Sequence, residues 1–108
     1  MAHYLFQGAY TREAWAEQLK NPQNRAELVR PVIEGLGGRI ENVYFAFGDY
    51  DILLILDMPD NVSMAALALA VAAGGAFKSQ LTTPLMTIED GLAAMRKATG
   101  AGYRPPGG

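Results

Sequence analysis

Acidic residues gather in one short segment, FGDYDILLILDMPD, where carboxylates could bind a metal ion or act as general acid and base. Asp49 and Asp51 alternate near its start, and Asp57 and Asp60 lie near its end. In a strand that rises ~3.3 Å per residue, Asp51 and Asp57 are about 20 Å apart and cannot share one ion. We therefore expect no metal site, with Asp51 accepting hydrogen bonds from turn amides and Asp60 capping a helix.

His3 is the only histidine, and so the only side chain that titrates near neutral pH without a perturbed pKa. Of all the residues, it is the best suited to act as a general base or as a haem ligand. The commoner alternative for a lone histidine near a chain end is a structural or exposed side chain. The residues alone leave both interpretations open.

Several aromatic side chains could wall a pocket for an apolar or aromatic ligand, although core or interface packing is the usual role. Arg25 could bind a ligand carboxylate, with a solvated surface arginine as the alternative. The candidate ligand-binding residues are His3, Trp15, Arg25, Tyr44 and Phe47.

Other chemistries have little support. Ser63 and Ser79 belong to no nucleophile motif. The GLGG segment ends a helix rather than opening one, so it does not form a phosphate-binding loop. The chain has no cysteine, which excludes disulfides and thiolate sites. We expect no cofactor.

Charge and hydropathy limit the classes of partner and the cellular location that we expect. Nine basic and eleven acidic residues give a net charge of −2 without a basic stripe, which argues against nucleic-acid binding. The longest apolar segment, residues 64–73, is too short to cross a bilayer. The first ten residues lack a signal-peptide pattern, so we expect a cytoplasmic protein.

The order of expected elements predicts an α+β fold. We expect strands at 3–10, 39–47, 50–58 and 77–86, and helices at 12–20, 22–36, 62–73 and 88–98. This order is a ferredoxin-like βαββαβ arrangement with one antiparallel sheet and an added C-terminal helix. Residues 1–98 form the domain, and residues 99–108 form a glycine- and proline-containing tail that is either frayed or laid across a neighbouring subunit.

The GDYD segment resembles a tight hairpin turn. Gly48 and Asp49 predict a two-residue type II′ turn, with Tyr50 and Asp51 opening the next strand. Residues 52–56 are apolar at every position, which predicts cover on both faces of that strand. A chain of this length has no second layer to offer. We therefore expect a homodimer or higher homo-oligomer, packed as a dimeric α+β barrel.

The run from GGRIENVYFAFGDYDILLILDMPD to TTPLMTIED resembles the GYD domain family, as do NPQNRAELV and the GYRPP ending. The resemblance implies the same ferredoxin-like, dimeric-barrel fold and assigns no catalytic residue. The hairpin alone is also similar to effector-binding domains of the leucine-responsive and asparagine-regulator type, which bind amino acids or similar small molecules between subunits. No helix-turn-helix precedes it here.

Three functions remain open. The first is a small-molecule binding or sensing module with its site in the barrel or between subunits. The second is a cofactor-independent enzyme, similar to the small barrel monooxygenases and isomerases at the level of fold only. The third is a structural or assembly subunit. A ligand pocket is expected near His3 and Tyr44, whereas a structural subunit predicts a filled interior.

Overall fold

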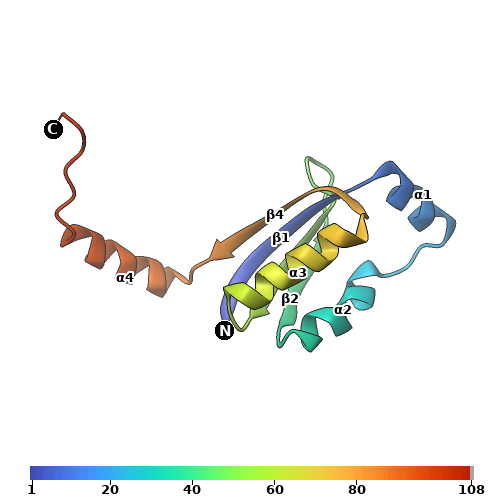
Figure 1. Ribbon diagram of the computed structural model, residues 1–108, viewed down its shortest axis with the longest axis horizontal. Coiled ribbons are helices and arrows are strands. Elements are labelled where there is room, and N and C mark those ends of the chain that lie inside the picture. Colours follow the sequence, from blue (N-terminus) through green and yellow to red (C-terminus); the bar gives the residue numbers. More distant parts are fainter. Residues whose placement is uncertain (108) are drawn as a thin grey trace.

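A computed structural model describes residues 1–107 and confirms the ferredoxin-like α+β fold (Figure 1). One four-stranded antiparallel sheet has the strand order β2-β3-β1-β4. The elements are β1 (Ala2–Tyr10), α1 (Arg12–Lys20), α2 (Arg25–Gly35), β2 (Arg39–Phe45), β3 (Ile52–Met58), α3 (Asn61–Gly74), β4 (Phe77–Leu85) and α4 (Ile88–Thr99).

The helices α2 and α3 cover the same face of the sheet (Figure 1). Alternate residues of β1 and β3, such as Phe6 and Leu54, are buried on that face and form the core. The intervening residues Leu5, Leu53 and Ile55 are only partly buried, because none of the described helices covers the opposite face. The unbroken apolar run of β3 is therefore covered on one side only.

Local capping explains where the first two helices begin. The Thr11 hydroxyl accepts a hydrogen bond from the Ala14 N–H at 3.0 Å and starts α1. The next helix does not restart at Pro22 as expected. It starts at Arg25, because the Asn24 side chain caps α2. The Asn24 Oδ1 accepts hydrogen bonds from the N–H groups of Ala26 and Glu27.

Glycine ends α2 as the sequence predicts. Gly37 has a φ of 86°, in the left-handed region that a side chain disfavours. Its N–H donates to the Glu34 carbonyl at 2.9 Å, and the Gly38 N–H donates to the Ile33 carbonyl at 3.0 Å. These two bonds form a Schellman motif, which turns the chain directly into β2.

The predicted two-residue hairpin turn is wrong. The first strand of the hairpin ends at Phe45 and the second begins at Ile52, so residues 46–51 form the connection. The Ala46 N–H donates to the Asp51 carbonyl at 2.8 Å and closes the loop. Gly48 lacks the positive φ that a type II′ turn requires.

Asp51 stabilises the sheet rather than the turn. Its Oδ2 accepts hydrogen bonds from the Tyr10 N–H at 2.8 Å and from Trp15 Nε1 at 3.3 Å. Its own N–H donates to the Gly8 carbonyl at 2.8 Å. The expectation that Asp51 bonds turn amides is therefore wrong, because the carboxylate joins the end of β1 to α1.

An aromatic cluster closes the same end of the helix-covered face. The Phe77 ring stacks on Tyr10 at a centroid distance of 4.6 Å and meets Phe6 edge-on at 5.8 Å. This packing requires glycine at position 8, because a Cβ there would lie 2.4 Å from the Phe77 ring.

The last helix stands apart from the rest of the chain. Figure 1 shows α4 and the following tail extending away from the sheet. No α4 residue is buried, and its apolar side chains Ile88, Leu92 and Met95 are 82%, 43% and 65% exposed. These residues repeat at i, i+4 and i+7 and so form one apolar stripe, which has no partner among residues 1–107.

Asp51→Ala should lower the free energy of unfolding by about 1–3 kcal/mol, because two donors, the Tyr10 amide and the Trp15 indole, lose their acceptor. Urea denaturation followed by circular dichroism measures this change. The matched control is Asp49→Ala in the same loop, where the side chain is exposed. Equal losses in the two variants would contradict the assignment.

Gly8→Ala should destabilise the fold by roughly 1–3 kcal/mol, because the added methyl group overpacks the Phe77 ring. The melting temperatures of the variant and the wild type, measured by thermal unfolding, give the loss of stability. Gly91→Ala is the control, since a Cβ at that position meets nothing within 4 Å. A Gly8 variant as stable as the wild type would show that the aromatic cluster is not packed this way.

Candidate functional site

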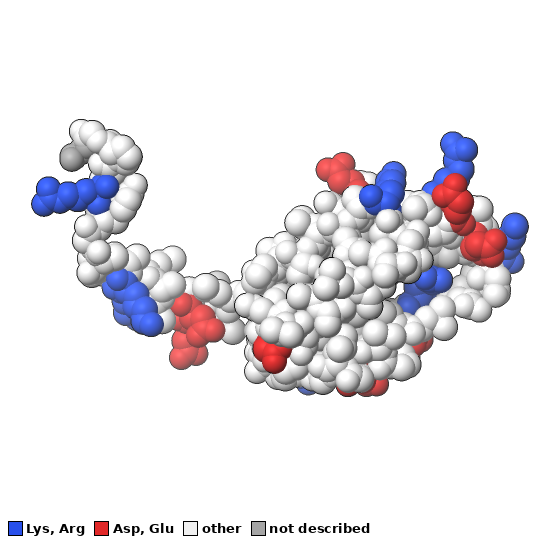
Figure 2. Space-filling model, viewed as in Figure 1, with Lys and Arg blue, Asp and Glu red and all other residues white. Residues whose placement is uncertain are grey.

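A cavity of about 220 Å³ lies between the sheet and the helices that cover it. Its floor comes from β1 and β3, and its walls come from α2 and α3. Figure 2 shows a hollow on this side of the molecule, with basic side-chain atoms at its edge. The lining residues are Phe6, Tyr10, Arg25, Ala26, Val29, Ile33, Ile52, Leu54, Leu56, Leu67, Val71, Gly74, Ala76 and Phe77.

Small residues on the covering elements leave this space open. The first turn of α2 places Ala26 at the cavity. Gly74, the last residue of α3, and Ala76, in the connection to β4, also line it. Larger side chains at these positions would fill the gap between the helices. The cavity is thus a consequence of side-chain size at the points where α2 and α3 approach the sheet.

Arg25 is the one charged side chain in the lining of this cavity. It also lines an adjoining hollow of about 260 Å³ together with Tyr44 and Phe45. Within residues 1–107 its guanidinium forms no ion pair within 4.0 Å. An apolar cavity with one unpaired cation at its edge suits an apolar molecule that has an anionic group.

Arg25 also acts on Tyr10 inside the cavity. Burial raises the pKa of the Tyr10 hydroxyl, although the hydrogen bond and the positive charge of Arg25 act in the opposite direction. Tyr10 is therefore protonated at neutral pH. Its hydroxyl adds a second polar group to an otherwise apolar lining.

The five predicted ligand-binding residues do not form one site. Arg25 and Tyr44 line the same hollow. Trp15 lies behind the first cavity, with its ring 5.1 Å from that of Tyr10. Phe47 is fully exposed in the hairpin loop, and His3 belongs to a separate cluster. The pocket expected near both His3 and Tyr44 is thus divided between two places.

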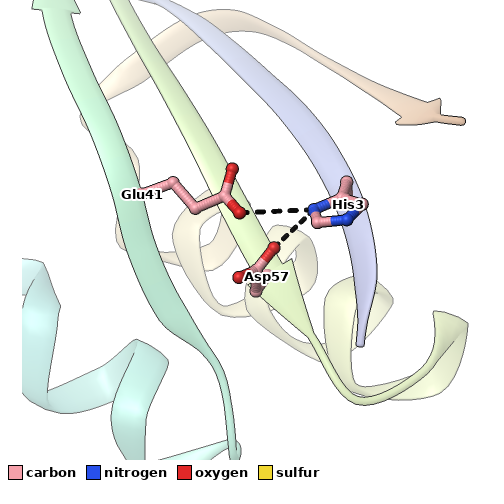
Figure 3. Close-up of side chains that lie close together, drawn as sticks. All are labelled: His3, Glu41 and Asp57. Atoms are coloured by element: carbon pink, nitrogen blue, oxygen red, sulfur yellow. Dashed lines mark ion pairs between the residues drawn. The ribbon is translucent and has the colours of Figure 1, made fainter. Parts of the chain in front are cut away.

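His3 meets two carboxylates at one end of the sheet (Figure 3). Its Nδ1 lies 2.5 Å from Asp57 Oδ1 and 3.4 Å from Glu41 Oε1. Asp57 is only 1% exposed, and its Oδ2 accepts a hydrogen bond from Arg39 Nε at 2.6 Å. The three side chains come from β1, β2 and β3, and their ligand atoms lie within 4.8 Å of one another.

The two carboxyl groups of this cluster have opposite pKa shifts. Burial raises the pKa of Asp57, but the adjacent Glu41, Arg39 and His3 outweigh it, so the pKa lies below its ordinary value. The adjacent Asp57 carboxylate raises the pKa of Glu41. Asp57 therefore has the negative charge and Glu41 retains its proton more readily.

Asp57, for which the sequence predicts no partner, is buried and paired. Spacing along one strand separates Asp57 from Asp51 but does not reveal partners on the neighbouring strands. The antiparallel register places both His3 and Arg39 opposite Asp57. A β-bulge between Ile40 and Asn42 adds Glu41 to the group. The contacts of Asp57 with His3 and with Arg39 follow from antiparallel pairing of the predicted strands.

The other predicted structural residues are dispersed. Gly48, Asp49 and Tyr50 lie in the hairpin loop. Asp60 is the N-cap of α3, and its carboxylate accepts a hydrogen bond from the Ser63 N–H at 2.8 Å. None of these side chains lines either hollow.

Within residues 1–107, every helix falls short of the length and hydrophobicity that a bilayer-crossing helix requires. No curated protein matches the chain in sequence. The sequence model of the GYD domain matches residues 4–95, a span that contains the cavity lining, the hairpin loop, Glu41 and Asp57, and that begins one residue after His3. The chain therefore belongs to the GYD domain family.

Proposed function

We propose that this protein is a small-molecule-binding module whose ligand is a small, apolar organic acid. The site is the cavity between the sheet, α2 and α3. The observation that carries the proposal is the position of Arg25 at the edge of an apolar cavity, where it has no acidic partner within residues 1–107. The expected ligand places its hydrocarbon part inside and its anionic group at Arg25.

The size of the cavity supports a small ligand. Pockets for drug-sized molecules have volumes of about 300–1,000 Å³. The volume of about 220 Å³ found here suits a shorter chain or a single ring. The apolar lining contributes affinity through burial of hydrocarbon surface, at roughly 25 cal/mol per Å².

The charge of Arg25 supports an anionic group over a neutral one. The other arginine of α2, Arg30, is paired with Glu27 at 2.9 Å on the exposed side of the helix. Arg25 lacks such a pair within residues 1–107 and lies in the first turn, where helix amides also favour an anion. A ligand carboxylate would supply the missing negative charge.

We propose further that the functional unit is a homodimer. The apolar residues on the bare face of the sheet are partly exposed, and Leu81 and Leu85 of β4 extend this surface. A second copy of the chain would cover it. The stripe on α4 supports the same partner, since α4 has no buried residue of its own.

The charges of α4 favour self-association. Its first turn contains Glu89 and Asp90, and its last turn contains Arg96 and Lys97. Two such helices placed antiparallel across a twofold axis bring the acidic end of one beside the basic end of the other. A second copy is therefore complementary both in apolar surface and in charge.

Octanoate should bind the wild-type protein more tightly than octan-1-ol, because only the acid can pair with Arg25. Isothermal titration calorimetry measures both affinities. Arg25→Gln should weaken octanoate binding by about tenfold, the equivalent of roughly 1.4 kcal/mol. It should leave octan-1-ol binding almost unchanged.

Arg30→Gln is the matched control, because Arg30 lies on the same helix but outside the cavity lining. It should retain wild-type preference for the acid. Equal binding of acid and alcohol by the wild type, or no binding of either, would contradict the proposed ligand class.

Ile55→Lys should convert the dimer to a monomer, because it places a charge in the middle of the bare apolar face. Light scattering coupled to size-exclusion chromatography measures the mass. Leu69→Lys is the control, since Leu69 is an apolar residue of α3 that is 71% exposed on the other side of the molecule. A wild-type protein that is monomeric at micromolar concentration would contradict the dimer.

A further inference from the structure

We propose that His3, Glu41 and Asp57 form a binding site for one divalent transition-metal ion, with Zn²⁺ as the best fit. This site lies at the end of the sheet, on three neighbouring strands (Figure 3). It uses none of the residues that line the cavity. The metal site and the organic-acid site can therefore be tested separately.

The donor set suits a borderline metal. The cluster offers one imidazole nitrogen and two carboxylate oxygens, and these three atoms lie within 4.8 Å of one another. Zn²⁺ binds such ligands at about 2.0–2.2 Å, usually in a tetrahedral arrangement. Three protein ligands leave a fourth position for water or a substrate. Mg²⁺ fits less well, because it prefers six oxygen ligands in octahedral geometry.

Asp57 provides the independent observation that favours a ligand. The side chain is only 1% exposed, yet its Oδ1 accepts no hydrogen bond within the described residues. A buried carboxylate oxygen without a donor is costly. The His3 Nδ1 lies 2.5 Å away, but the contact does not have hydrogen-bond geometry. A cation bound by the imidazole nitrogen and this oxygen would satisfy both atoms. Tetrahedral bonds of about 2.0–2.2 Å place two ligand atoms roughly 3.3–3.6 Å apart, so the two side chains would separate by about 1 Å when the ion binds.

Arg39 leaves that oxygen free for the metal. Its Nε bonds to Oδ2 of Asp57, the other oxygen of the carboxylate, at 2.6 Å. This contact fixes the orientation of Asp57 so that Oδ1 points toward His3 and Glu41 (Figure 3). Partners of this kind commonly orient metal ligands in proteins.

The backbone also directs the third ligand into the cluster. The β-bulge in β2 falls between Ile40 and Asn42, so Glu41 is the residue without a partner on β3. A bulge redirects a side chain that regular pairing would place elsewhere. Here Glu41 reaches the imidazole that β1 supplies, at 3.4 Å.

An ion pair between His3 and Asp57 is the competing explanation for the cluster. It requires a protonated imidazole that donates its Nδ1 proton to Oδ1. The observed contact does not align with that proton, and it leaves Oδ1 without a donor. A protonated His3 paired with both carboxylates accounts for their approach, whereas the metal explanation also accounts for the oxygen without a donor.

The test is calorimetric titration of ZnCl₂ into the untagged 108-residue chain after treatment with a chelator. We expect one Zn²⁺ per chain, and no comparable heat with MgCl₂. Substitution with Co²⁺ should give the visible absorption of a tetrahedral site. His3→Gln and Glu41→Gln should each weaken Zn²⁺ binding by at least tenfold while circular dichroism shows an intact fold.

Glu34→Gln is the control, because Glu34 is an exposed acid on α2, away from the cluster. It should bind Zn²⁺ like the wild type. Asp57→Asn provides a further variant, whose result counts only if the protein folds. The proposal is overturned if the wild type binds no Zn²⁺, or if the His3 and Glu41 variants bind it as tightly as the Glu34 control.

Discussion

A four-stranded sheet with helices on only one face is the constraint on which the rest of the structure depends. The helix-covered face contains the core, and imperfect filling beneath α2 and α3 creates the cavity there. The opposite, bare face contains partly exposed apolar residues and the His3 cluster. Each side of one sheet therefore presents a different chemistry, and β1 and β3 contribute to both.

The hairpin loop that contains the GDYD segment has a structural role beyond its turn. The Asp51 carboxylate binds the Tyr10 amide and the Trp15 indole, so it joins three elements at one end of the sheet. The Tyr10 ring lines the cavity and stacks on Phe77. Asp51, the second aspartate of the GDYD segment, thus stabilises the wall of the proposed ligand site, although it does not line the cavity.

Much of the fold follows from local signals in the sequence. Thr11, Asp60 and the glycines after α2 act through hydrogen bonds within a few residues, so the helix ends they set can be predicted. The hairpin could not, because Asp51 is fixed by residues of β1 and α1 far away in the sequence. Likewise, the start of α2 depends on which asparagine, Asn21 or Asn24, provides the cap.

The candidate sites depend less on local signals. The sequence identifies Arg25 as a possible partner for a carboxylate, but the cavity beside it depends on how closely two helices pack on the sheet. Asp57 could have been paired with His3 from the antiparallel register alone. Glu41 could not, because the bulge that brings it near is a break in that register.

The most direct test of the central claim is methyl NMR of the isotope-labelled protein during titration with octanoate. We expect chemical-shift changes at Ile33, Leu67 and Val71, whose side chains line the cavity. We expect no comparable changes at Leu5 and Ile55 on the bare face of the sheet. Changes confined to the bare face, or no saturable changes at all, would contradict a ligand site between the helices and the sheet.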